Sequence, residues 1–254
     1  MSFVVFITGA SSGFGAEIAR TLVNHGDKVI ILARRKDKLQ SLQEELGVQN
    51  CAFIAADVND NKTIALALED IYIKRHWEID VLVNNAGLAR GLTSANQSLL
   101  SDWEEMIQTN ILALVSLTHY LLPKMVERGY GHIVNMGSIA GSYPYPGGNV
   151  YGATKAFVKQ FSLNLRADLY DKNIRVTDIE PGLAGGSEFS LVRFKGDEAK
   201  ANQVYEGTTP LMPKDIAEAV KWVIHLPKHI NINRLEIMPT TQAPAALNVH
   251  KNNL

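Results

Sequence analysis

The hydrophobic pattern of this chain alternates between two kinds of segment. Short, mostly apolar runs are separated by longer segments in which apolar residues recur every three or four positions. The short runs are apolar on both faces, as in parallel strands that helices cover on both sides, and the longer segments have the spacing of amphipathic helices. Strands are therefore predicted at residues 3–8, 28–33, 51–55, 81–84, 132–136, 175–179 and 235–238.

This alternation favours one fold class. It predicts an α/β fold with a doubly wound, Rossmann-type parallel sheet of about seven strands and helices on both faces. Long helices are expected over 101–122, where Ser101 and Glu104 have the spacing of a capping box, and over 151–170. No linker rich in Gly, Pro or Ser divides the chain, so residues 1–254 are interpreted as a single domain. The weakly periodic stretch 181–213 is typical of a functional lid, expected near residues 183–213.

Composition narrows the classes of function. The chain has 25 Lys and Arg against 26 Asp and Glu, a net charge of −1, so binding to nucleic acid or to an anionic membrane is not expected. Its apolar runs are much shorter than the roughly 20 residues of a membrane span, and no signal peptide is apparent, so a soluble, cytoplasmic protein is predicted. The single cysteine, Cys51, excludes an intrachain disulfide and is expected in the core. The seven histidines have no metal-ligand spacing, so no metal is expected.

A glycine-rich segment lies between the first predicted strand and the first predicted helix. At such a place glycines permit a tight turn, and backbone N–H groups at the helix start can bind a pyrophosphate. The spacing here is Gly-x-x-x-Gly-x-Gly, which differs from the commoner Gly-x-Gly-x-x-Gly. An ordinary turn is the alternative. The candidate cofactor-binding residues of this segment are Gly9, Ala10, Ser11, Ser12, Gly13, Phe14 and Gly15.

Tyr151 and Lys155 form a second candidate site. Their spacing of four puts both side chains on one face of a helix. A tyrosine with a pKa near 10 is a poor base at neutral pH, and a nearby ammonium group is expected to lower that pKa by favouring the phenolate. The pair could then act in general acid/base catalysis. The alternative is an ordinary tyrosine and lysine on a partly exposed helix.

Further motifs follow in a fixed order along the chain. They are Asn84-Asn85-Ala86-Gly87, then Asn110, Ser138, Tyr151-x-x-x-Lys155 and Pro181-Gly182. Together with the glycine segment, this series resembles the short-chain dehydrogenase/reductase family over essentially the whole chain. The resemblance implies an oxidoreductase in which a nicotinamide cofactor carries out hydride transfer and the protein supplies orientation and electrostatics.

The resemblance also implies roles for individual residues. Tyr151 would exchange a proton with the substrate oxygen, and Ser138 would polarise that oxygen. Lys155 would also hold the nicotinamide ribose, and Asn110 would keep a water relay behind the lysine; alternatively, Asn110 satisfies nearby backbone groups. Asp57 would contact the adenine or, alternatively, cap the next helix. The cofactor set implied by the resemblance further includes Val58, Asn84, Ala86, Gly87, Pro181, Gly182, Leu183, Ala184 and Ser187, besides Tyr151 and Lys155.

Charge at the end of the second predicted strand bears on the choice of cofactor. A site selective for NAD usually has an acid there, which binds the ribose 2′-hydroxyl. Here Ala33 is followed by Arg34 and Arg35, whose guanidinium groups can bind a 2′-phosphate through charge-assisted hydrogen bonds. NADP is therefore the predicted cofactor. A solvated basic turn is the alternative, since Lys36 and Lys38 continue the run.

Several segments in the second half of the chain resemble one subgroup of the family, the bacterial NADP-dependent 3-hydroxy acid dehydrogenases. They are residues 141–157, 178–182, 188–189 and 192–196. The resemblance implies small substrates such as serine, allo-threonine and 3-hydroxypropionate, or malonic semialdehyde in the reverse direction. Such an acid needs a cation for its carboxylate, because an unpaired buried carboxylate is costly. Arg193 is the preferred candidate, and Lys195 and Arg90 are alternatives.

Two alternative functions and an oligomeric state also follow from the sequence and the resemblance. A short-chain carbonyl reductase for larger ketones is the alternative within the enzymes, although charges such as Lys195 and Glu198 argue against a wide apolar lid. A non-catalytic NADP(H)-binding sensor is the alternative from another class, but such proteins characteristically lack the tyrosine or the lysine. By resemblance, a homotetramer is expected through the two long helices, with the tail 240–254 a candidate to pack on a neighbouring subunit.

Overall fold

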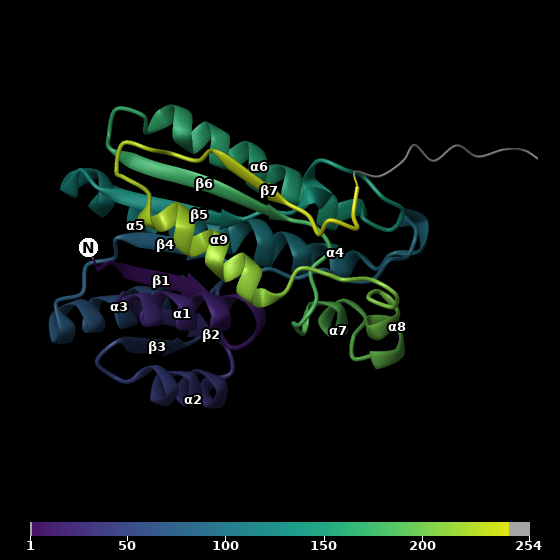
Figure 1. Ribbon diagram of the computed structural model, residues 1–254, viewed down its shortest axis with the longest axis horizontal. Helices are drawn as coiled ribbons and strands as arrows, with labels where there is room; N and C mark the ends of the chain where they lie inside the picture. The colour runs from purple at the N-terminus through teal and green to yellow at the C-terminus, as the bar shows by residue number, and fades with distance from the viewer. Residues whose placement is uncertain (1, 244–254) are drawn as a thin grey trace, which may run out of the picture.

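One parallel sheet organises the molecule (Figure 1). The computed structural model describes residues 2–243. The strand order is β3-β2-β1-β4-β5-β6-β7, and every neighbouring pair is parallel. The strands are β1 Val4–Thr8, β2 Lys28–Ala33, β3 Cys51–Ala55, β4 Val81–Asn84, β5 Gly131–Met136, β6 Ile174–Pro181 and β7 Arg234–Ile237. The predicted doubly wound fold is confirmed, with strand boundaries that differ by at most one residue except at the C-terminal end of β6, which is two residues longer than predicted.

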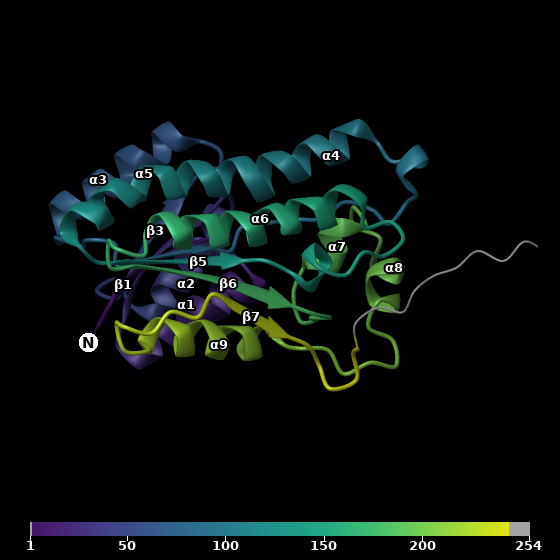
Figure 2. The same cartoon turned by 90° about the horizontal axis from the view of Figure 1, so that it is seen from above.

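Two helical layers cover the two faces of the sheet (Figure 2). Alternate residues of the strands face each layer, so the core is divided in two. Both faces of the central strands are thus buried, which is why these runs are continuously apolar in the sequence. One layer contains α1 Gly13–His25, α2 Lys36–Leu46 and α9 Pro213–His225, and the other contains α3 Asn61–Arg75, α5 Ala113–Arg128 and α6 Asn149–Asp168.

The helix predicted over 101–122 differs from the observed one. It consists of α4 Leu100–Ile107, a π-helical turn η2 over Gln108–Leu112, and α5. The capping box is wrong, because the helix begins at Leu100 with Leu99 at the N-cap, and Ser101 already lies within the first turn. The other long helix, predicted over 151–170, is α6 and begins two residues earlier.

The predicted lid segment leaves the sheet after β6 and returns at α9. It carries two short helices, α7 Phe189–Arg193 and α8 Glu198–Gln203, between irregular stretches. A single bridge pairs Ala184 with Leu211 at its base. Both helices lie beyond the C-terminal ends of the strands (Figure 1). Of the tail whose packing was predicted, residues 244–254 lie outside the described residues.

Two remaining expectations concern the core and membranes. Cys51 is fully buried in β3, and burial raises the pKa of its thiol to about 12, so it is a core residue as expected. Among residues 2–243, no helix has both the length and the apolar character that crossing a bilayer would require.

Candidate functional site

The glycine segment makes a tight crossing from β1 to α1. Gly9 and Gly13 have φ angles of +68° and +55°, a region that favours glycine. A Cβ on Gly15 would lie 2.6 Å from the carbonyl oxygen of Gly9, and one on Gly13 would lie 2.9 Å from the Cβ of Ser187 in the lid. Ser12 is the N-cap of α1, yet its side chain makes no capping hydrogen bond. The first turn of α1 therefore keeps N–H groups available for an anion.

A cleft of about 750 Å³ runs from this segment along the C-terminal edge of the sheet to the lid. Its place agrees with the strand order, because the chain switches direction between β1 and β4, and ligands of such sheets bind at this switch point. The predicted site residues that line it are Gly9, Ser11, Ser12, Gly13, Phe14, Arg34, Arg35, Asp57, Val58, Ala86, Gly87, Ser138, Tyr151, Lys155, Pro181, Gly182, Leu183, Ala184, Ser187 and Arg193.

Four predicted residues do not line this cleft. Ala10 and Gly15 are buried beneath the glycine turn, where they allow its close packing. Asn84 is buried at the end of β4 and donates to Thr118 at 3.1 Å and to Asn135 at 2.9 Å. These three residues support the walls of the cleft without facing it. The fourth residue that does not line the cleft is Asn110.

Asn110 lies in the π-helical turn, a feature frequent at functional sites. Its amide nitrogen donates to the carbonyl of Leu88 and to Thr154 Oγ1, while its oxygen accepts from the N–H of Leu88 at 2.9 Å. A Cβ on Gly87 would contact both Asn110 Oδ1, at 3.3 Å, and Lys155 Nζ, at 3.5 Å. The alternative interpretation of Asn110 as a residue that satisfies backbone groups is therefore correct for these contacts, and both its Oδ1 and Lys155 Nζ lie beside Gly87.

Ser138, Tyr151 and Lys155 come together at the floor of the cleft. Ser138 follows β5, and its Oγ accepts from the N–H of Ala140 at 3.1 Å, which fixes the turn. Tyr151 and Lys155 project from one face of α6, and the lysine Nζ lies 5.9 Å from the tyrosine ring centroid. Lys155 donates to the carbonyl of Met136 at 2.7 Å, so its ammonium group is anchored to β5.

Burial dominates the protonation of this group. It raises the pKa of Tyr151 to about 12, although hydrogen bonding to Ser138 and the charge of Arg193 act in the opposite direction. The expectation of a lowered tyrosine pKa is thus wrong, because desolvation outweighs the neighbouring charges. Burial also lowers the pKa of Lys155 to about 8, and the charge of Asp178 counteracts this shift.

The two arginines after β2 have different surroundings. Arg34 is largely exposed, with its nearest acid, Asp57, at 3.9 Å. Arg35 reaches across the glycine segment: its guanidinium donates to Ser11 and Ser12 at 2.9 Å and pairs with Glu188 of the lid at 2.7 Å. Asp57 does not cap α3, since Asp60 is its N-cap and accepts from the N–H of Thr63.

Three cations were candidates for binding a substrate carboxylate, and the structure separates them. Arg90 is paired with Glu105 at 2.6 Å, and Lys195 with Asp102 at 2.8 Å. Arg193 lines the cleft with no carboxylate partner among residues 2–243. Its guanidinium carbon lies 5.2 Å from the ring centroid of Tyr151, and its Nη2 donates to the hydroxyl of Tyr145 at 2.6 Å.

Several residues of the site escaped the sequence interpretation. Asn85 also lines the cleft, and its side chain donates to the carbonyl of Thr8 at 2.8 Å, so it joins β1 to the loop after β4 and does more than form a turn. Gln242 accepts from the N–H of Leu183 at 2.7 Å at the base of the lid. Only the position of Asn85 directly after a predicted strand could have indicated its role; Gln242 is remote in sequence, and nothing in its neighbourhood marks it.

Comparison with known proteins places this fold and site in a family. A sequence model described as short chain dehydrogenase matches residues 3–190. The NADP-dependent 3-hydroxy acid dehydrogenase YdfG of Salmonella typhi is 56% identical over 250 residues, covering 98% of this chain and 100% of that protein. Serine 3-dehydrogenase of Rhizobium radiobacter is 47% identical over 253 residues, covering 99% of each.

A solved structure is similar as well. The closed form of serine dehydrogenase complexed with NADP+ aligns with a TM-score of 0.95 and 54% identity, covering 98% of this chain and 100% of that one. The chain therefore belongs to the short-chain dehydrogenase family. The resemblance predicted from the order of the motifs is confirmed.

Proposed function

We propose that the protein is an NADP-dependent oxidoreductase that transfers a hydride between NADP(H) and the hydroxyl or carbonyl carbon of small 3-hydroxy acids. One observation carries the proposal: Arg193, free of an acidic partner in the described part of the chain, lies 5.2 Å from the ring of Tyr151 in the cleft. The names of the relatives, a 3-hydroxy acid dehydrogenase and a serine dehydrogenase, support the same substrate class.

The residues along the cleft fit a phosphorylated dinucleotide. Gly9 and Gly13 line the cleft, and the uncapped first turn of α1 offers backbone N–H groups to a pyrophosphate. Arg34 and Arg35 supply cations where the 2′-phosphate of NADP would bind. Asp57 and Val58 would line the adenine side, and Lys155 would bind the ribose next to the nicotinamide. When bound, the cofactor supplies or accepts the hydride.

Tyr151 would handle the proton. With its pKa raised to about 12, the phenol is protonated at neutral pH and can donate to a carbonyl oxygen during reduction. To act as a base in the oxidative direction, the Tyr151 hydroxyl must first lose its own proton. Positive charge close to the ring favours the resulting phenolate. Arg193 supplies such charge directly, and Lys155 supplies it at a greater distance. Ser138 would hold the substrate oxygen beside this hydroxyl.

The substrate carboxylate would bind to Arg193. A guanidinium group binds a carboxylate through two parallel hydrogen bonds, which orients a small acid as well as holding it. Arg193 Nη2 is held by the hydroxyl of Tyr145, while its Nε is buried without a partner among residues 2–243. The side chain as a whole is only partly buried and lines the cleft, so its guanidinium group can be reached by a ligand there. A small acid held there would present its 3-hydroxyl near Tyr151.

Initial rates of NADP+ reduction would test the proposal. The panel contains L-serine, L-allo-threonine, 3-hydroxypropionate and a simple secondary alcohol, each with wild type and with Tyr151→Phe. Tyr170→Phe is the matched control, because Tyr170 lies beyond the end of α6 and is exposed. We expect the acids to be turned over by wild type and by the control, and not by Tyr151→Phe. Turnover of the plain alcohol alone would favour a reductase for larger ketones, and tight NADPH binding without turnover would favour a sensor.

We propose a homotetramer assembled through α4, α5 and α6, and a location in the cytoplasm, where NADP(H) is available. Large apolar side chains on this layer are exposed, among them Ile107, Leu112 and Phe157, and such a patch is typical of an interface. Sedimentation of Leu112→Glu is expected to give smaller species, while Leu66→Glu on α3 sediments as wild type does. Cell fractionation tests the location.

A further inference from the structure

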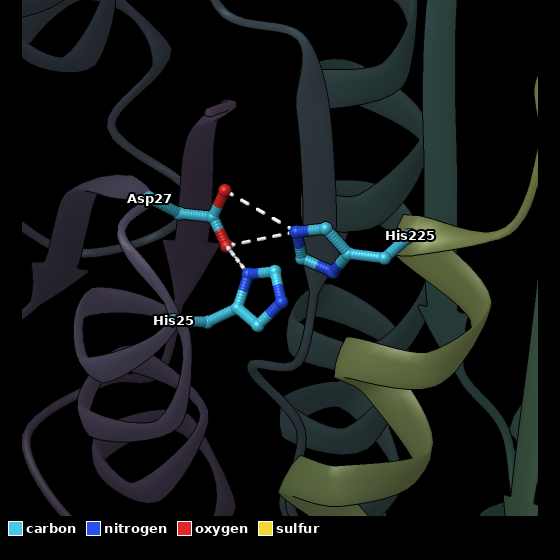
Figure 3. A group of neighbouring side chains, drawn as sticks. All are labelled: His25, Asp27 and His225. Atoms are coloured by element: carbon cyan, nitrogen blue, oxygen red, sulfur yellow. Dashed lines mark hydrogen bonds and ion pairs between the residues drawn. The ribbon is translucent and has the colours of Figure 1, made fainter. Parts of the chain in front are cut away.

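Three potential metal ligands meet at the edge of the sheet opposite the cleft (Figure 3). His25 is the last residue of α1, Asp27 directly precedes β2, and His225 is the last residue of α9. These positions adjoin the N-terminal ends of the strands, whereas Ser138 and the lid follow the C-terminal ends. One ligand atom from each residue lies within 4.8 Å of the other two. The cluster is therefore separate from the proposed active site.

Asp27 is the centre of the cluster. Its side chain is entirely buried. One carboxylate oxygen, Oδ1, accepts from the N–H of Phe3 at 2.9 Å, which fixes the orientation of the group. The other oxygen, Oδ2, is buried without a hydrogen-bond partner in the described chain and lies between the two imidazole rings. A buried carboxylate oxygen without a partner is costly, and metal coordination is one of the ways in which proteins satisfy it.

The histidines are oriented as ligands. His225 Nδ1 lies 2.9 Å from the carbonyl oxygen of Lys221, and because a carbonyl only accepts, this nitrogen carries the hydrogen. In a neutral imidazole, Nε2 then has a free lone pair, and it faces both oxygens of Asp27, Oδ2 at 3.1 Å and Oδ1 at 3.3 Å. His25 Nδ1 faces the same oxygen at 3.6 Å. A backbone carbonyl that fixes the tautomer in this way is typical of histidines bound to zinc.

A cation between these atoms would remove the repulsion between lone pairs. A proton on His225 Nε2 would pair only that ring with Asp27, and two protonated imidazoles would repel each other, because their ring centroids are only 4.0 Å apart. A single divalent ion satisfies all three ligand atoms at once. Metal–ligand bonds of about 2.1 Å in a tetrahedral site place neighbouring ligand atoms about 3.4 Å apart. The two separations from Asp27 Oδ2, 3.1 and 3.6 Å, bracket that value, and the two histidine nitrogens lie within 4.8 Å of each other.

We propose that His25 Nδ1, Asp27 Oδ2 and His225 Nε2 bind one divalent transition-metal ion of the zinc class. Imidazole and carboxylate ligands suit Zn²⁺, and the exposed side of His25 leaves a fourth position for water. The ion would join the C-terminal ends of α1 and α9, two helices that pack against each other, and through Asp27 would hold the start of β1. Its role would be structural, since the chemistry of the cleft takes place at the other edge of the sheet.

Equilibrium dialysis of untagged, chelator-treated protein against ZnCl₂, with the metal measured by mass spectrometry, tests the site. We expect one Zn²⁺ per chain, binding at least about tenfold weaker in His25→Gln and in His225→Gln, and a melting temperature that zinc raises in wild type but not in these two variants. His229→Gln, an exposed histidine four residues beyond the cluster, is the matched control and should bind as wild type does.

Cobalt provides a second readout that does not depend on stability. Co²⁺ in place of Zn²⁺ should give the visible absorption of a low-coordinate site in wild type and in His229→Gln, and lose it in His25→Gln. The side chain of His25 is nearly half exposed, so this variant should keep its fold, which circular dichroism can verify. Absence of stoichiometric binding would overturn the proposal, and so would zinc binding that persists unchanged in His25→Gln and His225→Gln.

Discussion

Arg35 and Glu188 form an ion pair of 2.7 Å across the cleft, between the loop after β2 and the lid. Glu188 also accepts from Ser12 Oγ at 2.8 Å, so one carboxylate contacts both the glycine segment and the arginine. Pairing with Arg35 and the bond from Ser12 lower the pKa of Glu188, which keeps it charged at neutral pH. This acid neutralises a cation that the proposed function assigns to the 2′-phosphate of NADP.

Removing this carboxylate should strengthen binding of the phosphorylated cofactor. In Glu188→Gln, a 2′-phosphate no longer competes with an acid for Arg35. The pair is nearly half exposed, so the gain should be modest, up to about fivefold in the Kd for NADPH. Fluorescence titration with NADPH and NADH measures it, with Glu198→Gln in α8 as the control. Equal tightening for both cofactors would contradict this account.

The two arginines should determine the cofactor preference. Replacing Arg34 and Arg35 by glutamine removes charge-assisted hydrogen bonds, which contribute about 1.5–3 kcal/mol each. The KM for NADPH should rise about tenfold or more, while that for NADH changes little. Steady-state kinetics with both cofactors provide the measurement, and Lys38→Gln, in the same basic run, is the control. Equal effects on the KM values of both cofactors would support the alternative, in which the basic run is an ordinary solvated turn.

Arg193 should distinguish acids from neutral alcohols. Arg193→Ala removes the proposed carboxylate partner, so kcat/KM for 3-hydroxy acids should fall about 100-fold, in line with a lost charged hydrogen bond of about 3 kcal/mol. Any turnover of a simple secondary alcohol should change much less. Lys195→Gln is the control, because Lys195 is paired with Asp102 of α4 and does not line the cleft. Unchanged kinetics with the acids would contradict the role of Arg193 as the partner of the substrate carboxylate.

The buried His132 should make the fold sensitive to acid. Burial, with the nearby charge of Arg175, holds the pKa of His132 well below its usual 6.5. The unfolded chain therefore takes up a proton at this residue as the pH falls below about 6.5, while the folded chain does not. Stability should be fully present above that pH and lost below it, by about 1.4 kcal/mol per pH unit.

Urea unfolding at pH 7.5 and 5.5 measures this contribution. Between the two values, wild type should lose about 1.3 kcal/mol more than His132→Gln, whose side chain does not titrate. Loss of the contact with Thr177 can change the absolute stability of the variant, so only the difference between the two pH values is compared. An identical pH dependence in both proteins would show that His132 does not contribute.

The sheet and the cleft could be predicted because their determinants are local in sequence. Continuous apolar runs such as residues 28–33 identify strands covered on both faces, and residues at the C-terminal ends of parallel strands necessarily meet at one edge. That rule brought Gly9, Ser138 and Pro181 into one cleft. The roles of individual residues came from the resemblance to the family.

The features that the sequence did not predict depend on tertiary contacts. Ser101 and Glu104 have the spacing of a capping box, but the chain enters α4 earlier, and spacing alone does not reveal where the first turn begins. The raised pKa of Tyr151 follows from burial, which the sequence does not show. His225 lies about 200 positions from Asp27 in the chain, so no motif could have joined them.

The π-helical turn over Gln108–Leu112 also determines the relative rotation of the two helical segments that it joins. Each residue of an α-helix advances the side chains by about 100° around the axis, so the wider turn shifts the phase of α4 relative to α5. Trp103 and Met106 pack under the cleft as a result, while Leu117 and Leu121 face the sheet. Deleting one residue of this turn would restore a regular helix. It would also rotate either α4 or α5, so that the apolar side chains of that helix would lose their present contacts.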